Sequence, residues 1–252
     1  MPIKHSLPFI TGMGYRKLCN YVYDEFTKMD IDKVKQFKGM RIFVKTDLLP
    51  EFVANVLGKI TVGFELYTHN SDFGIKEVHL YILENPWLIC WYAQNIWFKH
   101  KKLKSIPIGI ANSRWPHGNV ETLKKIMREK NEKNMLLYCN FDVNTNPLER
   151  SDCLNKIWPY KNDTKKSFEE YLRLVSKSYF VISPNGNGID CHKHWEAMYL
   201  KAIPIVTKSF NIEQYPNYPF LIIDSWDDFK KLKLTKELYD SIINDKIYNL
   251  YL

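Results

Sequence analysis

The sequence has no apolar stretch approaching the ~20 residues that a membrane-spanning helix needs. The first fifteen residues also lack the positively charged start and apolar core of a secretion signal. The five cysteines are widely spaced and include no CxxC pair, so they predict neither a zinc site nor a redox pair. We therefore expect no membrane span, reduced thiols and a cytoplasmic, reducing compartment.

Signatures of nucleic-acid binding are missing as well. The formal net charge of +8 would suit a polyanion. The lysines are scattered, however, or lie in short runs such as Lys99–Lys104, and no basic stripe is interleaved with aromatic residues. Without a helix-turn-helix, ribonucleoprotein or zinc-knuckle pattern, we expect no nucleic-acid partner, whereas a basic surface also suits a nucleotide diphosphate.

What the sequence does contain is enough apolar material for a large core and an alternation of two kinds of segment. Of its 252 residues, 45% are hydrophobic and 15% aromatic, which excludes a disordered chain. Short apolar runs alternate with helix-like stretches, and this predicts βα repeats with mostly parallel sheets. Strands are expected at Arg41–Lys45, Ile60–Tyr67, Ser105–Ile110, Met135–Cys139, Tyr179–Ser183, Ala202–Thr207 and Phe220–Ile223. Helices are expected near Leu49–Leu57, Asn85–Ile96, Glu121–Glu132, Pro147–Trp158, Ser167–Ser176 and His192–Leu200.

A segment rich in loop formers, Ser113–Asn119, separates two halves of this pattern. We place the domain boundary there, with an N-terminal α/β domain over residues 1–118 and a C-terminal α/β domain over 119–252. The predicted fold is α/β, with two Rossmann-like domains facing across a cleft, the GT-B architecture of many glycosyltransferases. Ligands of such folds bind at the carboxyl ends of the strands.

The most informative stretch runs from Phe180 to Val206. A buried strand is followed by a loop with Gly186 and Gly188, and a helix starts near Asp190. Glycines let the backbone approach a ligand closely, and the free amides of a helix N-terminus favour an anion. The pattern therefore suits a diphosphate.

Lys193 and Glu196 lie three residues apart on one face of that helix, so both side chains can point into one cleft. A cation beside the phosphates and a carboxylate that accepts ribose hydroxyls are what a nucleotide sugar needs. The alternative is an exposed pair worth a few tenths of a kcal/mol on an ordinary βα turn, and spacing alone slightly favours this alternative.

This segment resembles the C-terminal motif of exostosin-like glycosyltransferases, in which an Arg-x-x-Glu pair precedes an Ile-Pro-Val strand. The matching residues are Lys193, Glu196 and Ala202–Val206, with Lys193 in place of the usual arginine. The chain is similar in particular to the small enzymes of this family in large DNA viruses, which would place it in the host cytoplasm. Further matching blocks are Thr68–Asp72, Leu83–Pro86, Pro107–Ser113 and Trp115–Asn119.

The resemblance implies a metal-independent, inverting glycosyltransferase. Its donor would be a nucleotide diphosphate sugar, in most of the family a uridine diphosphate (UDP) sugar, with UDP-xylose and hexose donors both compatible. A glycan or glycoprotein would be the acceptor, and neither a cofactor nor a metal is implied. The N-terminal domain would bind the acceptor, and the C-terminal domain would bind the nucleotide sugar. The alternative function is a non-catalytic carbohydrate- or nucleic-acid-binding protein.

An inverting transfer needs a base for the acceptor hydroxyl, and we expect it in the first half of the chain. Asp72 is the leading candidate because it directly follows a predicted strand. His69 can orient Asp72 or act instead, since its usual pKa is nearer neutrality. Asn70, Ser71 and Asp72 can equally form an Asx-type turn that caps the next helix.

Several other residues are candidates for the donor and acceptor sites. Arg150 can hold the diphosphate, although a salt bridge on its own helix explains it as well. Trp115 and His117 are assigned to an acceptor or interdomain contact, because aromatic faces suit sugar rings, while packing between domains is the more frequent reason for such a tryptophan. The remaining donor-site candidates are Asn140, Ser183, Asn185, Asn187 and His192. Ser183, Asn185 and Asn187 are also common turn residues.

Overall fold

The computed structural model describes residues 7–164, 166–246 and 249–252. The chain divides into two compact units, of which one ends at Ile108 and also takes in Leu252, while the other runs from Gly109 to Tyr251. Segment 109–118, which the predicted boundary assigns to the first domain, thus groups with the second unit. Its contacts explain this grouping, because the carbonyl oxygen of Gly109 lies 2.7 Å from Nδ1 of His192.

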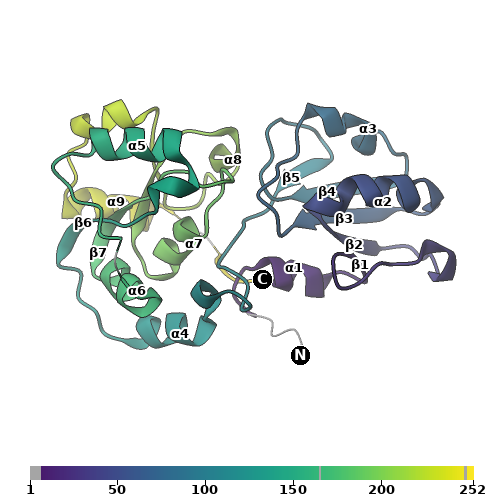
Figure 1. The fold of residues 1–252 in the computed structure, drawn as a ribbon, viewed down its shortest axis with the longest axis horizontal. Helices are drawn as coiled ribbons and strands as arrows, with labels where there is room; N and C mark the ends of the chain where they lie inside the picture. Colours follow the sequence, from purple (N-terminus) through teal and green to yellow (C-terminus); the bar gives the residue numbers. More distant parts are fainter. Residues whose placement is uncertain (1–6, 165, 247–248) are drawn as a thin grey trace. The chain divides into compact units, whose positions relative to one another are not determined.

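The N-terminal unit is built on a five-stranded parallel sheet whose strand order, β1-β2-β3-β4-β5, follows the chain (Figure 1). The strands are β1 (Tyr21–Tyr23), β2 (Met40–Lys45), β3 (Phe64–His69), β4 (Leu88–Ala93) and β5 (Leu103–Ser105). The helices are α1 (Gly12–Leu18), α2 (Leu49–Asn55) and α3 (Leu80–Leu83), with short 3-10 turns η1 (Ile31–Lys33), η2 (Thr46–Leu48), η3 (Leu57–Lys59) and η4 (Glu77–His79).

Helices cover both faces of this sheet. Tyr15 of α1 packs with Ile10, Phe43 and Ile106 on one face, and α2 and α3 lie on the other (Figure 1). Because the strand order never reverses, right-handed crossovers place both connecting helices on the same side.

The C-terminal unit contains a four-stranded parallel sheet, again in chain order, β6-β7-β8-β9. Its strands are β6 (Met135–Cys139), β7 (Ser178–Ile182), β8 (Ile203–Thr207) and β9 (Leu221–Ile223). The helices are α4 (Val120–Arg128), α5 (Pro147–Lys156), α6 (Phe168–Ser176), α7 (His192–Tyr199), α8 (Phe210–Glu213) and α9 (Lys236–Asp245), with 3-10 turns η5 (Pro116–Gly118), η6 (Val143–Thr145) and η7 (Trp226–Lys231).

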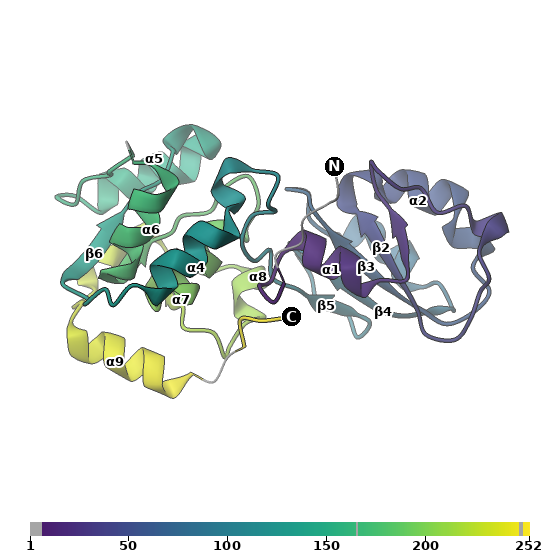
Figure 2. The same cartoon turned by 90° about the horizontal axis from the view of Figure 1, so that it is seen from below.

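One hydrophobic cluster of this unit lies between the strands of its sheet and α5, η7 and α9. Phe180 and Ile205 of the strands pack there with Cys153 of α5, Phe229 of η7 and Tyr239 of α9. Helices α4, α6 and α7 lie next to one another along the sheet (Figures 1 and 2). The α/β class and the parallel sheets predicted from the sequence are confirmed.

Two segments were predicted with the wrong structure. Of the strand predicted at Ser105–Ile110, only Ser105 lies in a strand, at the end of β5. The sequence Asn85–Ile96 suggests a helix, but Leu88–Ala93 forms strand β4. Helices lie on both faces of this sheet, and the strand has the continuous apolar sequence Leu-Ile-Cys-Trp-Tyr-Ala. Such a run has no period-2 alternation, and periodicity cannot separate it from a buried helix.

Two further expectations concern the cysteines and the membrane-spanning helices. All five cysteines are free thiols. Among the helices that the structure describes, none is both long and apolar enough to cross a membrane.

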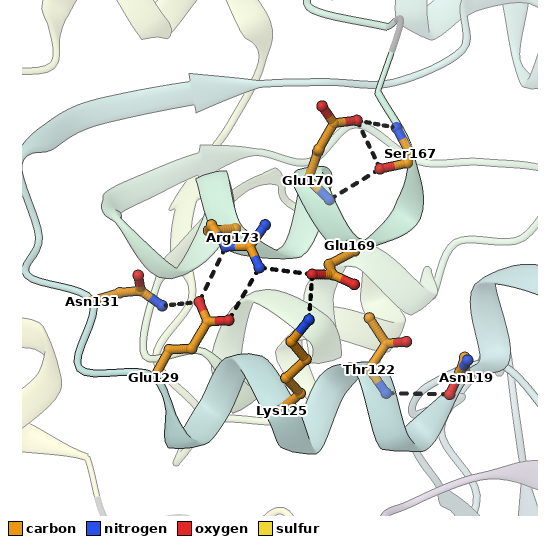
Figure 3. A network of polar contacts seen from close by, with 9 residues as sticks. All are labelled: Asn119, Thr122, Lys125, Glu129, Asn131, Ser167, Glu169, Glu170 and Arg173. Carbon is orange, nitrogen blue, oxygen red and sulfur yellow. Dashed lines mark hydrogen bonds and ion pairs between the residues drawn. The ribbon is translucent and has the colours of Figure 1, made fainter.

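A polar network joins α4 to α6 (Figure 3). Arg173 donates to both carboxylate oxygens of Glu129, at 3.1 and 3.0 Å, and to Glu169 at 2.7 Å. Lys125 donates to the same oxygen of Glu169. Arg173 lowers the pKa of Glu129 to about 2, so the network binds fewer protons in the folded chain than in the unfolded chain.

We predict that Arg173→Met reduces the loss of stability in acid. The pKa of Glu129 is lowered from 4.5 in the folded chain. The ionised carboxylate therefore contributes fully to the free energy of unfolding above pH 4.5, and this contribution is lost as the pH falls toward 2. Urea unfolding midpoints measured between pH 7 and pH 2.5 should therefore change less in the variant. Lys208→Met, which removes a single exposed ion pair with Glu213, serves as the control. An acid dependence identical to wild type would contradict the role of Arg173.

Candidate functional site

The candidate donor residues gather at the carboxyl ends of β6, β7 and β8. Asn140 follows β6, Ser183 follows β7, and residues 183–191 form the loop from β7 to the first turn of α7. We call residues 183–191 the donor loop. Parallel strands bring these ends to one edge of the sheet, which explains why residues distant in sequence meet there.

The donor loop is closed at its base by a buried histidine. Nδ1 of His194 accepts from the amide of Cys191 at 3.3 Å, and its Nε2 lies 3.3 Å from the carbonyl oxygen of Ser183. Asp190 accepts from the indole of Trp195 at 2.7 Å. His194 thereby ties the start of the loop to its end, and Asp190 fixes the loop to the body of α7.

Gly186 sits at the tightest point of the loop. Its amide lies 3.0 Å from Sγ of Cys191, and its carbonyl oxygen accepts from Nδ2 of Asn146 at 3.0 Å. A Cβ at this position would lie 3.2 Å from Nη2 of Arg150. The absence of a side chain therefore lets the guanidinium lie directly against the loop.

Arg150 of α5 is held by main-chain carbonyls alone. Nε donates to the oxygen of Asn185 at 2.9 Å and Nη1 donates to the oxygen of Asp142 at 2.5 Å, while the guanidinium lies over the ring of Phe141. The residue is only 8% exposed. Within the described parts of the chain, no carboxylate lies within ion-pair distance of it, so the helix salt bridge weighed as an alternative is not formed. The charge is oriented without being neutralised.

Lys193 repeats this arrangement on α7. Its Nζ donates to the carbonyl oxygen of Asn140 and lies 4.7 Å from the ring centroid of Tyr171. Burial lowers the pKa of Lys193 to about 8, against an opposing effect of Glu196. As with Arg150, the described residues place no carboxylate within 4.0 Å of the ammonium.

Glu196 lies one turn further along α7 and is 5% exposed. Its Oε2 accepts from the hydroxyl of Tyr171 at 2.9 Å. Burial raises the pKa of Glu196, while Lys193 and the Tyr171 hydroxyl lower it. In the part of the chain that the structure covers, Oε1 has no hydrogen-bond partner, so one carboxylate oxygen is available to a ligand.

Two buried polar atoms in the same place lack partners among the described residues, Oγ of Ser183 and Oδ1 of Asn185. Buried polar atoms without partners are rare in folded proteins, and each calls for a ligand, an ion or a water molecule. The donor loop therefore presents unpaired oxygen atoms close to the two cations.

The other donor candidates have different positions. The side-chain amide nitrogen of Asn140 is engaged within the protein, since it donates to the carbonyl oxygen of Asp163 and to the hydroxyl of Tyr138. Asn187 is exposed on the loop. His192, at the start of α7, bonds Gly109 and lies 6.2 Å, ring to ring, from His117.

Trp115 and His117 belong to the C-terminal unit, which the sequence did not predict. Their rings are nearly parallel with centroids 6.2 Å apart, and Trp115 is half exposed. Through His117 and His192 this segment lies next to the N-terminus of α7. These two residues are thus neighbours of the donor loop.

Asp72 and His69, the predicted catalytic residues, lie in the N-terminal unit at the carboxyl end of β3. Asp72 is exposed, on a turn in which Ser71 accepts from the amide of Phe73. His69 is buried, its Nε2 lies 3.1 Å from the oxygen of Pro107, and its Nδ1 accepts from the amide of Asn70. Both ring nitrogens of His69 are thus engaged with the main chain.

No motif in the sequence singled out Tyr171, which contacts both Lys193 and Glu196. A signal was present, because Ser167 and Glu170 form a capping box that fixes the start of α6. With that start known, Tyr171 falls on the buried face of the helix.

The sequence matches no protein-family model, and comparison with curated proteins also finds no match. In the described residues, no group of three or more His, Cys, Asp or Glu side chains could hold a metal ion. The interpretation of the site therefore rests on its own chemistry and on the motif resemblance.

We predict that Lys193 loses its proton near pH 8, because burial disfavours the ammonium. An NMR titration of ¹⁵N-labelled lysine side chains should show one resonance with this midpoint that disappears in Lys193→Met. Lys133→Met identifies the resonance of the other lysine whose pKa burial lowers, to about 7. A Lys193 resonance that titrates above pH 10 would show that the ammonium is not desolvated.

Proposed function

We propose that the chain is a metal-independent, inverting glycosyltransferase of the exostosin-like kind with a GT-B arrangement. The donor loop would bind a nucleotide diphosphate sugar, with UDP as the expected nucleotide, and a glycan hydroxyl would be the acceptor. Support comes from the two α/β units, each with a parallel sheet, and from the polar and charged side chains at the carboxyl ends of β6 to β8.

The observation that carries this proposal is the pair of cations, Arg150 and Lys193, held by neutral carbonyl oxygens. A cation paired with a carboxylate has little attraction left for a ligand, whereas one bound to carbonyls keeps its full charge. Placing two such charges in a partly desolvated corner is costly without an anion. A diphosphate would offset that cost, and the amides of the donor loop suit its oxygens.

Each residue then has a distinct role in the proposed complex. Arg150, through Nη2, and Lys193 would bind the phosphates and stabilise the charge that develops on the leaving diphosphate. Glu196, through Oε1, would accept a ribose hydroxyl. Ser183 and Asn185 would find partners for their unpaired oxygens in the ligand or in water molecules that accompany it.

In the proposed reaction, the acceptor hydroxyl oxygen attacks the anomeric carbon of the donor. The new glycosidic bond forms as the bond from that carbon to the diphosphate oxygen breaks, and the nucleotide diphosphate leaves. The hydroxyl proton passes to a general base. We assign that role to Asp72, since it is exposed and His69 has both nitrogens engaged.

We predict that UDP raises the thermal unfolding temperature of the protein, and that Arg150→Met and Glu196→Ala each reduce this shift. Loss of a charged hydrogen bond costs about 1.5–3 kcal/mol, which corresponds to a roughly tenfold to hundredfold weaker affinity. Ligand binding to the folded state alone adds about 2.7 kcal/mol at 100 times the dissociation constant. Differential scanning fluorimetry and calorimetric titration measure both effects.

Lys133→Met is the matched control for these variants. Lys133 donates to the carbonyl oxygens of Ser176, Ser178 and Leu200, away from the donor loop. Its replacement should lower the unfolding temperature but leave the UDP shift intact. Absence of a shift with UDP and every other nucleoside diphosphate would refute the proposed donor site.

We also predict that Asp72→Asn abolishes sugar transfer while UDP binding is unchanged, because the amide cannot accept a proton. A screen of nucleotide sugars, which detects released nucleotide diphosphate and glycosylated product, gives the activity. Ser71→Ala, a change at the neighbouring position, should retain turnover. Undiminished turnover by Asp72→Asn would remove Asp72 from the role of base.

A further inference from the structure

The N-terminal unit carries an exposed tryptophan whose position is fixed by its surroundings. Trp97 follows β4 and is 50% exposed. Its amide donates to the carbonyl oxygen of Ile75 at 2.9 Å. The amide of Ile75 in turn donates to the carbonyl oxygen of Asn95 at 2.9 Å. These bonds continue the parallel pairing of the chain beyond the end of the strand, through the Ile75–Ile96 bridge.

Gly74 is what allows the indole to lie against this extension. A Cβ at Gly74 would lie 2.4 Å from Nε1 of Trp97 and 2.5 Å from the carbonyl oxygen of Asn95. Contacts of this length with a side-chain ring and with backbone do not occur, so only glycine fits here. Lys76 adds a second restraint, with its ammonium 5.5 Å from the centroid of the indole ring.

The turn that carries Asp72 is joined to the same structure. Nε2 of Gln94 donates to the carbonyl oxygen of Ser71 at 2.9 Å, and Nδ2 of Asn95 donates to the main-chain carbonyl oxygen of Asp72 at 3.5 Å. Phe73, which is 68% exposed, comes directly between Asp72 and Gly74. Two exposed aromatic rings, a carboxylate and an ammonium therefore belong to one short, restrained region.

We propose that Trp97 is the stacking platform of a glycan-binding subsite, with Phe73 and Asp72 at its edge. One face of a pyranose ring presents C–H groups and suits an indole, whereas its rim of hydroxyls needs charged and polar partners. The carboxylate of Asp72 and the ammonium of Lys76 favour a ligand that carries hydroxyls over a purely apolar one. A rigid ring also loses little conformational entropy on binding.

The role of this platform as the acceptor subsite of a transferase rests on the proposed function, whereas the binding of a glycan to it does not. The test uses the full chain and an array of defined oligosaccharides composed of hexoses, pentoses and N-acetylhexosamines, without nucleotide. Wild type should bind at least one of them. For that oligosaccharide, calorimetric titration should show about tenfold or greater weakening in Trp97→Ala and near wild-type affinity in Trp97→Phe.

Trp87 provides a matched control, since it is 43% exposed in the same unit but precedes β4 instead of following it. Trp87→Ala should retain glycan affinity, and Trp97→Ala should keep the circular dichroism spectrum and cooperative thermal unfolding of wild type, which shows that the variant is folded. If no oligosaccharide binds to wild type, or if Trp97→Ala binds as well as wild type, the platform is refuted. Glycan binding that depends on Trp97, with no response to any nucleotide, would support the platform and refute the transferase.

Discussion

The candidate donor site depends on two cations that are oriented by neutral oxygens. Carbonyl groups fix the direction of Arg150 and Lys193 through hydrogen bonds but carry no net charge. Burial lowers the pKa of Lys193, Glu196 opposes this effect, and repulsion by Arg150 adds a smaller lowering. The rest of the site follows from keeping these charges in place without cancelling them, through the tight turn at Gly186 and the closure of the loop by His194.

The course of the strands explains why such a site forms at the edge of the sheet. Strand order in both described sheets follows the chain, so neither has the reversal that creates a crevice in doubly wound folds. A ligand at the C-terminal unit must therefore be bound by the loops and helix starts at the carboxyl ends of the strands. Residues after β6 and β7 and the first turn of α7 supply these groups, and the donor loop is tied to β7 through Ser183 and His194.

The sequence predicted this part of the molecule well because its signals are local. The strand before Ser183, the glycines of the loop and the helix from His192 are each visible within a few residues. The partner groups were not predictable in the same way. That the guanidinium of Arg150 lies against Gly186, or that Tyr171 contacts Glu196, depends on the packing of α5 and α6, and no local pattern specifies it. Strand β4 was missed because its continuous run of apolar residues has no period-2 alternation.

The lysine at position 193 can be understood from this packing. An ammonium is compact, so it can reach one carbonyl oxygen and lie over the ring of Tyr171, whereas a planar guanidinium needs room for a fork of donors. Arg150 supplies the fork from α5 instead, with two of its nitrogens fixed and Nη2 beside the loop. In the proposed complex, the bidentate contact that an arginine on α7 would give to a phosphate is divided between two helices. The affinity for the diphosphate would then depend on how α5 and α7 pack against the sheet, not on α7 alone.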